Sequence, residues 1–437
     1  MRNVKGALCI KCGAQFEAEG EIYTCTKCGG ILEIEYNYDH IKTQISREKF
    51  AADKNFSMWR YLDFLPVEKD AVPGPLRAGW SPLYKTGLLA KTLGLKNLYI
   101  KDDGLNPTSS LKDRASAIAV ARAFSAGKDT VACSSTGNAA SSLAGAAASM
   151  GLKSVIFVPE RAPKGKLIQL LVFGAAVVSV KGDYGAAFRL SAQAIEKYGW
   201  YNRNAAINPF LSEGKKTVAM EIAEQLGLMI NDQNAHGFIS PDFVAVSVGD
   251  GCTIAGVWKG FKDLFAVGLI DKLPRLISVQ AEGCCPVNRA INRAVNQAVN
   301  RAVEKTVPIE PMEENTLADS IAVGVPRNGD KALAAIRESR GIAVNVSDDE
   351  ILAAIRLLGK TTGVFAEPAG AAGTAGLAKA AAQGLIPNDA LVVSIVTGNG
   401  LKDTASAQKA ADSESTLIHI EPDMNLLSGE FVKKGIH

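Results

Sequence analysis

The sequence predicts an α/β protein with two doubly wound three-layer domains, preceded by a small cysteine-rich module. Short runs rich in Val and Ile recur from residue 97 onward, and each is followed by small residues and then by a helical stretch. Continuous apolar strands that alternate with helices indicate parallel sheets covered on both faces. The 437 residues, 47% hydrophobic and 21% charged, are globular in composition and sufficient for two or three domains.

The predicted modules follow one another along the chain, except that the smaller α/β domain is inserted within the larger one. Residues 1–38 form the cysteine-rich module, and residues 39–79 form a linker or N-terminal arm that ends in proline-rich irregular chain. Residues 121–207 form the smaller α/β domain. The larger domain combines residues 80–120 with residues 208–437, and we expect it to contain the main ligand site.

The cysteine-rich module holds four of the eight cysteines, as two CxxC pairs separated by twelve residues: Cys9, Cys12, Cys25 and Cys28. A glycine follows the second cysteine of each pair and allows a sharp turn. Two thiolate pairs on such turns can close a tetrahedral Zn²⁺ site, and so short and polar a segment needs an ion to fold. We therefore predict a structural zinc ribbon with short strands at residues 21–25 and 31–36. Buried or redox-active thiols are the alternative.

Seven apolar runs are predicted as strands of the α/β body. They cover residues 97–103, 130–135, 154–159, 176–182, 243–251, 276–283 and 391–400. In doubly wound sheets, ligands bind at the carboxyl ends of the strands, where the glycine-rich turns lie. Residues 287–305 form a near-repeat of four residues that keeps no single apolar stripe, so we predict a solvated surface helix there.

Charge and hydropathy exclude several functional classes. The net charge of +3 is small and dispersed, which argues against nucleic-acid and anionic-membrane partners. No run of about 18 apolar residues could span a bilayer, and the first residues lack the apolar core of a signal peptide, so we expect a cytoplasmic protein. The histidines lie outside the glycine-rich turns, which argues against a histidine triad or metal centre. They are His40, His236, His419 and His437. The remaining cysteines are expected to be small buried hydrophobes. They are Cys133, Cys252, Cys284 and Cys285.

Three glycine-rich turns each follow a predicted strand. Their N–H groups, hydroxyls and helix dipoles can bind anions, although tight turns and helix caps require the same residues in any case. The turns contain Ser135, Thr136, Gly137 and Asn138; Gly249, Asp250, Gly251, Cys252 and Thr253; and Thr397 and Asn399. The second turn matches neither the dinucleotide fingerprint nor a Walker loop, so it suits a single phosphate on a small cofactor.

Lys112 begins a fourth helical stretch, where free N–H groups already make the helix end positive. A lone lysine is most often a surface cation. With Ser109 it forms an SxxK pair like that of serine acyl-enzymes, but the KTG triplet at residues 85–87 precedes the pair and no SDN triplet is present. The third alternative is a lysine that forms an imine with an aldehyde, because the positive helix end disfavours the ammonium form.

Together these residues resemble the pyridoxal-phosphate (PLP) enzymes of the tryptophan-synthase-β fold, fold type II, and most closely the threonine synthases. The resemblance covers nearly the whole chain, including the cysteine ribbon. Its motifs occur in the family's order: NPTSSLKDRAS, SSTGNAASSLAG, NPFLSEGKKT, GDGCTIAGVWKGF, ADSIAVGVPR and TGNGLKD.

The resemblance implies a role for each turn. Lys112 would form the Schiff base with PLP and move protons between Cα and Cβ of the substrate. Asn138 would bond the cofactor's ring hydroxyl, and Thr397 would face its pyridine nitrogen. Residues 249–253 would hold the cofactor phosphate, and residues 135–137 the substrate carboxylate. The implied enzyme, a homodimer, converts O-phospho-L-homoserine and water to L-threonine and phosphate by γ-elimination and β-addition.

Departures from the family pattern leave the substrate open. Ser109 and Leu111 stand where the family has Gly and Phe. Ala206 and Leu211 stand where related threonine synthases have a serine and an arginine that hold the substrate phosphate. The loss of an arginine–phosphate pair removes roughly 1.5–3 kcal/mol of binding. Three other basic residues could compensate: Lys166, Arg189 and Lys215.

Two alternative functions follow. One is a relative that acts on another activated amino acid, by cysteate-synthase-like β-replacement or as a β-eliminating ammonia-lyase. The other is a zinc-ribbon binding protein with a catalytically inactive body, against which Lys112, Asn138 and Thr397 argue.

Overall fold

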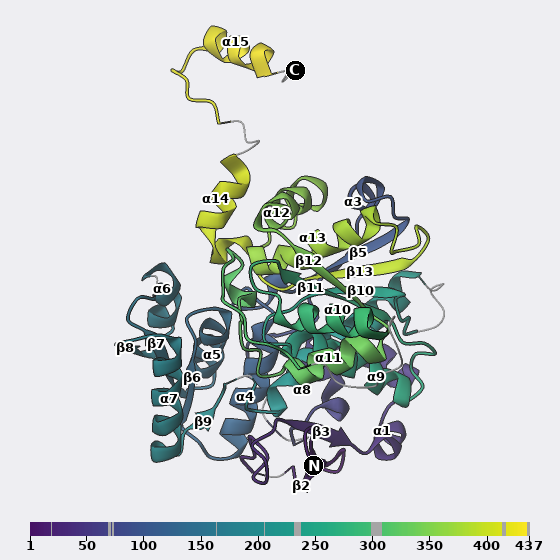
Figure 1. Ribbon diagram of the computed structural model, residues 1–437, viewed down its shortest axis with the longest axis vertical. Coiled ribbons are helices and arrows are strands. Elements are labelled where there is room, and N and C mark those ends of the chain that lie inside the picture. The colour runs from purple at the N-terminus through teal and green to yellow at the C-terminus, as the bar shows by residue number, and fades with distance from the viewer. Residues whose placement is uncertain are drawn as a thin grey trace.

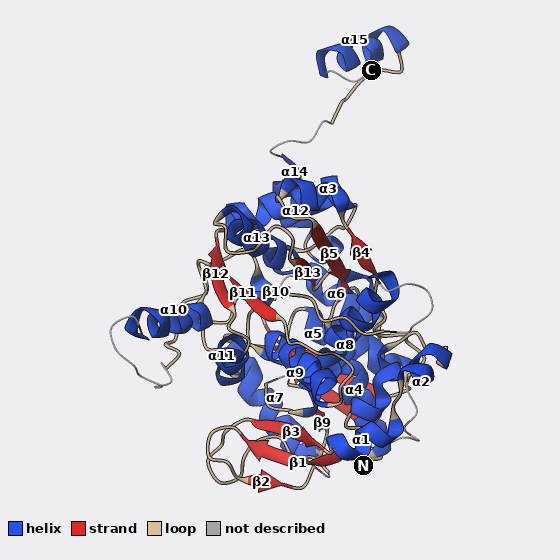
Figure 2. Ribbon diagram, turned by 90° about the vertical axis from the view of Figure 1, so that its right-hand side faces the viewer, coloured by secondary structure: helices blue, strands red, loops and turns tan. Residues whose placement is uncertain are grey.

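Three β-sheets and the helices around them make up the part of the chain described by the computed structural model, shown in Figure 1 and Figure 2. That part comprises residues 1–18, 20–68, 71, 74–162, 164–204, 206–230, 237–298, 308–412 and 417–434. A three-stranded sheet lies at the N-terminal end, and a four-stranded and a six-stranded sheet form the body. The predicted α/β class with parallel sheets is confirmed.

The four-stranded sheet is parallel throughout, with the order β8-β7-β6-β9. Its strands are β6 (Thr130–Ser134), β7 (Lys153–Pro159), β8 (Ala176–Val180) and β9 (Tyr201–Asn202). The helices between and before them are α4 (Lys112–Ser125), α5 (Asn138–Ser149), α6 (Lys164–Val172) and α7 (Tyr184–Tyr198). The first three strands lie where the sequence predicts them, whereas β9 is too short to show any periodicity.

The six-stranded sheet has the order β12-β11-β10-β13-β5-β4 and is parallel except for β4, which runs antiparallel to β5. Its strands are β4 (Leu83–Lys85), β5 (Asn97–Asp102), β10 (Phe243–Ser247), β11 (Arg275–Ala281), β12 (Ile342–Val346) and β13 (Leu391–Val396). Four of the seven predicted strands, β5, β10, β11 and β13, are present in this sheet. The sequence did not predict β4 and β12. Central strands such as β10 are buried on both faces, which explains their continuous apolar sequences.

Helices cover the six-stranded sheet on both faces (Figure 1). They are α3 (Gly87–Thr92), α8 (Phe210–Ile230), α9 (Cys252–Ala266), α10 (Pro286–Ala298), α11 (Gly329–Glu338), α12 (Asp348–Thr362) and α13 (Pro368–Ala382). Helix α8 packs between α4 and α9 and is buried from Phe210 to Gly227. The chain continues through α14 (Thr404–Asp412) to α15 (Met424–Lys434), which stands away from the body in Figure 1.

The N-terminal sheet has the order β2-β1-β3 and is antiparallel. Its strands are β1 (Val4–Cys9), β2 (Gln15–Phe16) and β3 (Leu32–Tyr36). The predicted strand at residues 31–36 is confirmed, but the one at residues 21–25 is wrong. Only Thr24 pairs there, in an isolated antiparallel bridge with Ile31, to which the N–H of Cys25 contributes its hydrogen bond to the carbonyl of Gly30.

Residues 39–79, where the sequence predicts a linker or arm, contain three short helices and pack against α8. The helices are α1 (Tyr38–Gln44), α2 (Arg47–Ala52) and the 3₁₀ helix η1 (Met58–Phe64). In η1, the Arg60 guanidinium and the Tyr61 hydroxyl both donate hydrogen bonds to the buried Glu224 carboxylate of α8.

The four-residue repeat begins as the helix that the sequence predicts, α10, but its first turn is buried rather than solvated. Asn288 is fully buried and donates hydrogen bonds to the carbonyls of Ser278 and Val344. Residues 299–305 of the repeat lie outside the described residues. Within the described part of the chain, no helix combines the length and apolar character needed to cross a membrane.

Candidate active site

Lys112 is the first residue of α4, as the sequence predicts, and its side chain lines a cavity of about 90 Å³. Two backbone hydrogen bonds join the segment before it to the turn after β13. The N–H of Leu111 donates to the carbonyl of Thr397 at 2.9 Å, and the N–H of Asn399 donates to the carbonyl of Ser109 at 3.1 Å. The lysine therefore lies at the carboxyl ends of the strands of the six-stranded sheet, where ligands bind in this architecture.

The cavity around Lys112, called here the lysine cavity, contains most of the predicted cofactor residues. Its lining includes Lys112, Lys215, Ser247, Gly249, Asp250, Gly251, Cys252, Thr253, Glu367 and Thr397. The Ser247 hydroxyl is buried and has no hydrogen-bond partner among the described residues. A buried unpaired hydroxyl beside a glycine-rich turn and a helix N-terminus is suited to a bound phosphate group.

The glycines of the second turn are required by close approach. Gly251 caps the N-terminus of α9 with φ of 89°, and a Cβ on it would lie 2.7 Å from the carbonyl oxygen of Asn328. A Cβ on Gly249 would lie 2.9 Å from Cα of Ile321. Side chains are thus excluded here, and the first N–H groups of α9 remain accessible to an anion.

Burial, together with the neighbouring Lys215 ammonium, lowers the pKa of Lys112 to about 8. Arg203 acts in the same direction, whereas Glu367 opposes it. The sequence predicts a lowered pKa from the helix end alone, and the structure shows that desolvation and a second lysine are the main causes. A lysine of this pKa supplies neutral amine near physiological pH, as attack on an aldehyde requires.

Asn138 lies at the start of α5 and faces Glu367 across the site. Its Nδ2 donates to Oε1 of Glu367 at 2.7 Å, and both residues are buried. Both line a second cavity of about 490 Å³ that also contacts Thr136 and Gly137. Because Glu367 also lines the lysine cavity, the two spaces meet at this side chain.

Ser135 lines a third cavity, of about 100 Å³, instead of the second. This third cavity is called here the arginine cavity, because Arg203 and Arg327 line it. Asp250 lines both the arginine cavity and the lysine cavity, so these two spaces are adjacent. The predicted carboxylate-binding residues 135–137 therefore divide between two spaces that flank the lysine.

The proposed replacements for the missing phosphate ligands lie in different places. Lys215 is buried and lines the lysine cavity, whereas Arg189 is exposed on α7. The side chain of Lys166 lies outside the described residues. Leu211 is fully buried in the apolar core of the four-stranded sheet, so its position belongs to the core in this chain.

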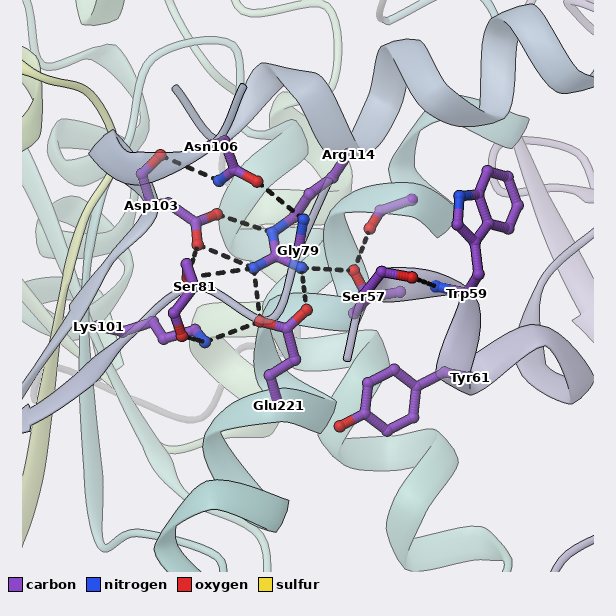
Figure 3. A network of polar contacts seen from close by, with 12 residues as sticks. Ser57, Trp59, Tyr61, Gly79, Ser81, Lys101, Asp103, Asn106, Arg114 and Glu221 are labelled. Carbon is purple, nitrogen blue, oxygen red and sulfur yellow. Dashed lines mark hydrogen bonds and ion pairs between the residues drawn. The ribbon is translucent and has the colours of Figure 1, made fainter. Parts of the chain in front are cut away.

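A buried ion network fixes α4 behind Lys112 (Figure 3). Arg114 donates to both Asp103 and Glu221, with the closest N–O distances 2.7 Å and 2.5 Å, and Lys101 donates to Glu221 at 2.7 Å. The side chains of all four are fully buried. These pairs tie α4 to β5 and α8, which holds the start of α4 against the sheet edge.

The four N-terminal cysteines come together as a cluster whose Sγ atoms lie within 4.8 Å of one another. The Cys9–Cys28 and Cys12–Cys25 Sγ distances are 3.5 Å and 3.7 Å. A tetrahedral ion with Zn–S bonds of about 2.3 Å requires S–S distances of about 3.8 Å, so this donor set fits Zn²⁺. By contrast, the four cysteines in the body are buried, as predicted.

Sequence inspection missed three residues of the site, Glu367, Ser247 and Arg203. Glu367 precedes a proline at the start of an alanine-rich helix, a pattern typical of any helix N-terminus. Ser247 lies inside the run predicted as a strand at residues 243–251, but the observed strand β10 ends at this residue, which places it at the ligand-binding edge. Arg203 follows the two-residue strand β9, which leaves no periodic pattern to mark it.

Comparison with known proteins agrees with this geometry. Residues 75–398 match the family model described as pyridoxal-phosphate dependent enzyme. The chain is 40% identical over 420 residues to the threonine synthase of Methanocaldococcus jannaschii, covering 96% of this chain and 97% of that protein. It is 39% identical over 398 residues to the threonine synthase of Methanosarcina acetivorans, covering 90% and 91%.

Solved structures share the architecture at lower identity. The processed form of threonine deaminase isoform 2 from Solanum lycopersicum superposes with a TM-score of 0.61 and 21% identity, covering 86% of this chain and 94% of that one. Diaminopropionate ammonia lyase from Escherichia coli, in complex with an aminoacrylate–PLP azomethine intermediate, gives a TM-score of 0.60 at 20% identity, covering 82% and 93%. At this identity the likeness shows a common fold.

Proposed function

This chain belongs to the pyridoxal-phosphate dependent enzymes and, among them, to the threonine synthases, and from this premise we propose that it makes L-threonine from O-phospho-L-homoserine with Lys112 as its central catalytic residue. One observation carries the proposal. An amine with a pKa of about 8 shares a cavity with a glycine-rich turn at a helix N-terminus. This combination provides both a nucleophile for an aldehyde and a site for its phosphate.

The residues around the lysine cavity fit PLP. The turn at residues 249–253 and the unpaired Ser247 hydroxyl would hold its phosphate. Asn138 would bond the ring hydroxyl, and the buried Thr397 would face the ring nitrogen without protonating it. When bound, PLP withdraws electrons from the amino acid and so makes the protons at Cα and Cβ acidic.

Lys112 then moves the protons of the reaction. It removes one proton from Cα and one from Cβ, the phosphate leaves Cγ with the electron pair of the C–O bond, and protons return at Cγ and Cα. Water adds its hydroxyl group at Cβ. An amine whose pKa is near the working pH is suited to both directions of transfer. Residues 135–137, beside the N-terminus of α5, would bind the substrate carboxylate.

The product distribution tests this function. Purified protein incubated with O-phospho-L-homoserine should release threonine and phosphate in equal amounts. Phosphate with 2-oxobutyrate and ammonia would indicate a lyase that eliminates phosphate from Cγ without adding water at Cβ. The absence of turnover would contradict the proposal and favour another activated amino acid as the substrate, the alternative that Ala206 and the buried Leu211 suggest.

We propose that the cysteine cluster binds one structural Zn²⁺. Metal analysis should find about one zinc per chain, and the Cys9→Ser/Cys12→Ser double variant should lose it. The Cys285→Ser variant is the control, because that thiol lies outside the cluster and should leave the zinc content unchanged. A wild-type protein without zinc would contradict the assignment.

We further propose that the enzyme is a cytoplasmic homodimer, as its family resemblance implies. Light scattering should give twice the chain mass of 46.0 kDa, and a mass of one chain would contradict the dimer.

A further inference from the structure

We propose that Arg203 and Arg327 bind the phosphate group of the substrate, in the arginine cavity beside the lysine cavity. The inference rests on the proposed function and assigns the substrate phosphate to two arginines at positions other than 211, where related threonine synthases have theirs. Neither arginine is among the three basic residues, Lys166, Arg189 and Lys215, that the sequence suggested as replacements.

Arg203 is a buried cation without an ionic partner. It is 1% exposed, and its Nε donates to the Ser116 hydroxyl at 3.1 Å. Its Nη2 has no hydrogen-bond partner, and no carboxylate forms an ion pair with it, among the residues that the structure describes. Burial lowers the pKa of Arg203 from its ordinary value, since nothing nearby fully compensates its charge. A buried guanidinium in this state favours a bound anion.

Two more unpaired groups line the same cavity. Asn204 Nδ2 and Ser134 Oγ are buried and have no hydrogen-bond partner within the described chain. The orientation of the Asn204 amide is fixed, because its Oδ1 accepts the N–H of Ser134 at 3.0 Å. With Arg203, three residues that each carry an unsatisfied group able to donate a hydrogen bond therefore line one cavity of about 100 Å³. Buried donors are rarely left unpaired in proteins, so this concentration indicates an anionic ligand.

The charges of the cavity also favour an anion. Arg327 lines it from the exposed side, with its guanidinium 3.9 Å from the centre of the Phe188 ring. One carboxylate, that of Asp250, also lines the space, and its Oδ1 accepts the backbone N–H of Arg327 at 2.7 Å. Two guanidiniums against one carboxylate leave a net positive charge. Tyr184, the remaining titratable side chain of the lining besides Cys133, is neutral because burial raises its pKa.

The position of the cavity suits the leaving group. It adjoins the lysine cavity through Asp250, and Ala206 contributes a small side chain to its wall. At the positions of the family's serine and arginine, this chain therefore has Ala206, in the wall of the arginine cavity, and Leu211, in the apolar core. Arg203 lies three residues before Ala206. We infer that the guanidinium function has moved from position 211 to position 203.

A matched pair of ligands tests the assignment in the holoenzyme. L-2-Amino-5-phosphonopentanoate replaces the ester oxygen of O-phosphohomoserine with a methylene group, and L-norvaline has the same carbon chain without the phosphonate. Each is titrated against the change in cofactor absorbance. The Arg203→Gln variant should bind the phosphonate about 10- to 100-fold more weakly, the effect of losing a charge-assisted hydrogen bond, and bind norvaline within about twofold of wild type.

Three further variants complete the test. Arg327→Gln, at an exposed position, should also weaken phosphonate binding selectively, and it carries the test if Arg203→Gln does not fold. Arg203→Lys should restore part of the affinity. Arg189→Gln, at an exposed arginine outside the cavity, is the control and should bind both ligands normally.

Two results would overturn the inference. If Arg203→Gln and Arg327→Gln weaken both ligands equally, the arginines serve the carboxylate or the cofactor. If wild-type protein binds the phosphonate no better than norvaline, there is no phosphate site. Because binding is measured without turnover, these results stand apart from the product assay, which decides the proposed function separately.

Discussion

Asn138 Nδ2 donates a 2.7 Å hydrogen bond to Glu367 Oε1, which joins the N-terminus of α5 to the N-terminus of α13. The two helices belong to different sheets, so this contact connects the two halves of the site. The Glu367 side chain also lies so close to Gly398 that any side chain at position 398 would clash with it. The carboxylate thus lies between Gly398 and the Asn138 amide.

This contact predicts that Asn138 and Glu367 act as a pair in cofactor binding. Asn138→Ala and Glu367→Ala should each weaken PLP affinity by about tenfold, because either change removes the buried hydrogen bond that joins the two side chains. The double variant should be little weaker than either single variant, since coupled residues give non-additive effects. Absorbance titration of apoprotein with PLP measures the affinities. Fully additive losses would contradict the pairing.

The pKa of Lys112 predicts how capture of PLP by the apoprotein depends on pH. The pKa is lowered, so the neutral amine appears at lower pH than in an ordinary lysine, and the capture rate should rise through a midpoint near pH 8. Lys215→Gln removes a neighbouring positive charge and should move the midpoint to higher pH. Lys42→Gln, on the exposed face of α1, should leave it unchanged. A wild-type midpoint near 10 would show that Lys112 is not perturbed.

Ser109 has a φ of 68°, in the left-handed region, at the position where the family has glycine. A non-glycine residue there costs about 1–2 kcal/mol, whereas glycine costs about 0.5–1 kcal/mol through its greater unfolded-state entropy. Ser109→Gly should therefore raise the free energy of unfolding by about 0.5–1 kcal/mol. Ser109→Ala keeps the strain and serves as the control. Equal stability of the two variants in denaturant titration would contradict this account.

The network in Figure 3 predicts a large stability loss when Glu221 is neutralised. Burial opposes ionisation of Glu221, but Arg114 and Lys101 hold its pKa at about 2. Glu221→Gln leaves two buried cations with a single carboxylate, Asp103, and should cost about 3–5 kcal/mol of unfolding free energy. The exposed pair of Asp129 and Lys153 is the control, and Asp129→Asn should cost under about 1 kcal/mol.

The same network predicts how stability depends on pH. The folded-state pKa of Glu221 lies below its ordinary value, so its contribution is complete above about pH 4.5 and is lost as the pH falls toward 2. The wild-type protein should therefore lose stability over this range more steeply than Glu221→Gln. Parallel acid-denaturation curves for the two proteins would contradict the prediction.

Local patterns were sufficient to predict most of the fold and part of the site. The seven predicted strands formed because continuous apolar runs have few other places to be buried. Lys112 and the turn at residues 249–253 could be identified because each motif is contiguous, and contiguous residues remain neighbours after folding. The same argument accounts for the cysteine pairs.

Features that depend on distant contacts could not be predicted in this way. Glu367 meets Asn138 across 229 positions, and no local pattern marks that pair. Arg203 follows the two-residue strand β9, so no sequence motif marks it. Its Nη2 has no hydrogen-bond partner among the described residues, and only the folded structure reveals this. The strand predicted at residues 21–25 is reduced to a single bridge between Thr24 and Ile31, and the alternating sequence does not reveal how short that pairing is.

The most direct test of the central claim, that Lys112 carries the cofactor, is the location of PLP after chemical fixation. Borohydride reduction of the holoenzyme fixes the cofactor to the amine that holds it, and mass spectrometry of the digested protein identifies that residue. The account predicts a single modified peptide with the cofactor on Lys112, and no such peptide from Lys112→Ala. Modification at Lys215, which shares the cavity, or protein that binds no PLP, would contradict it.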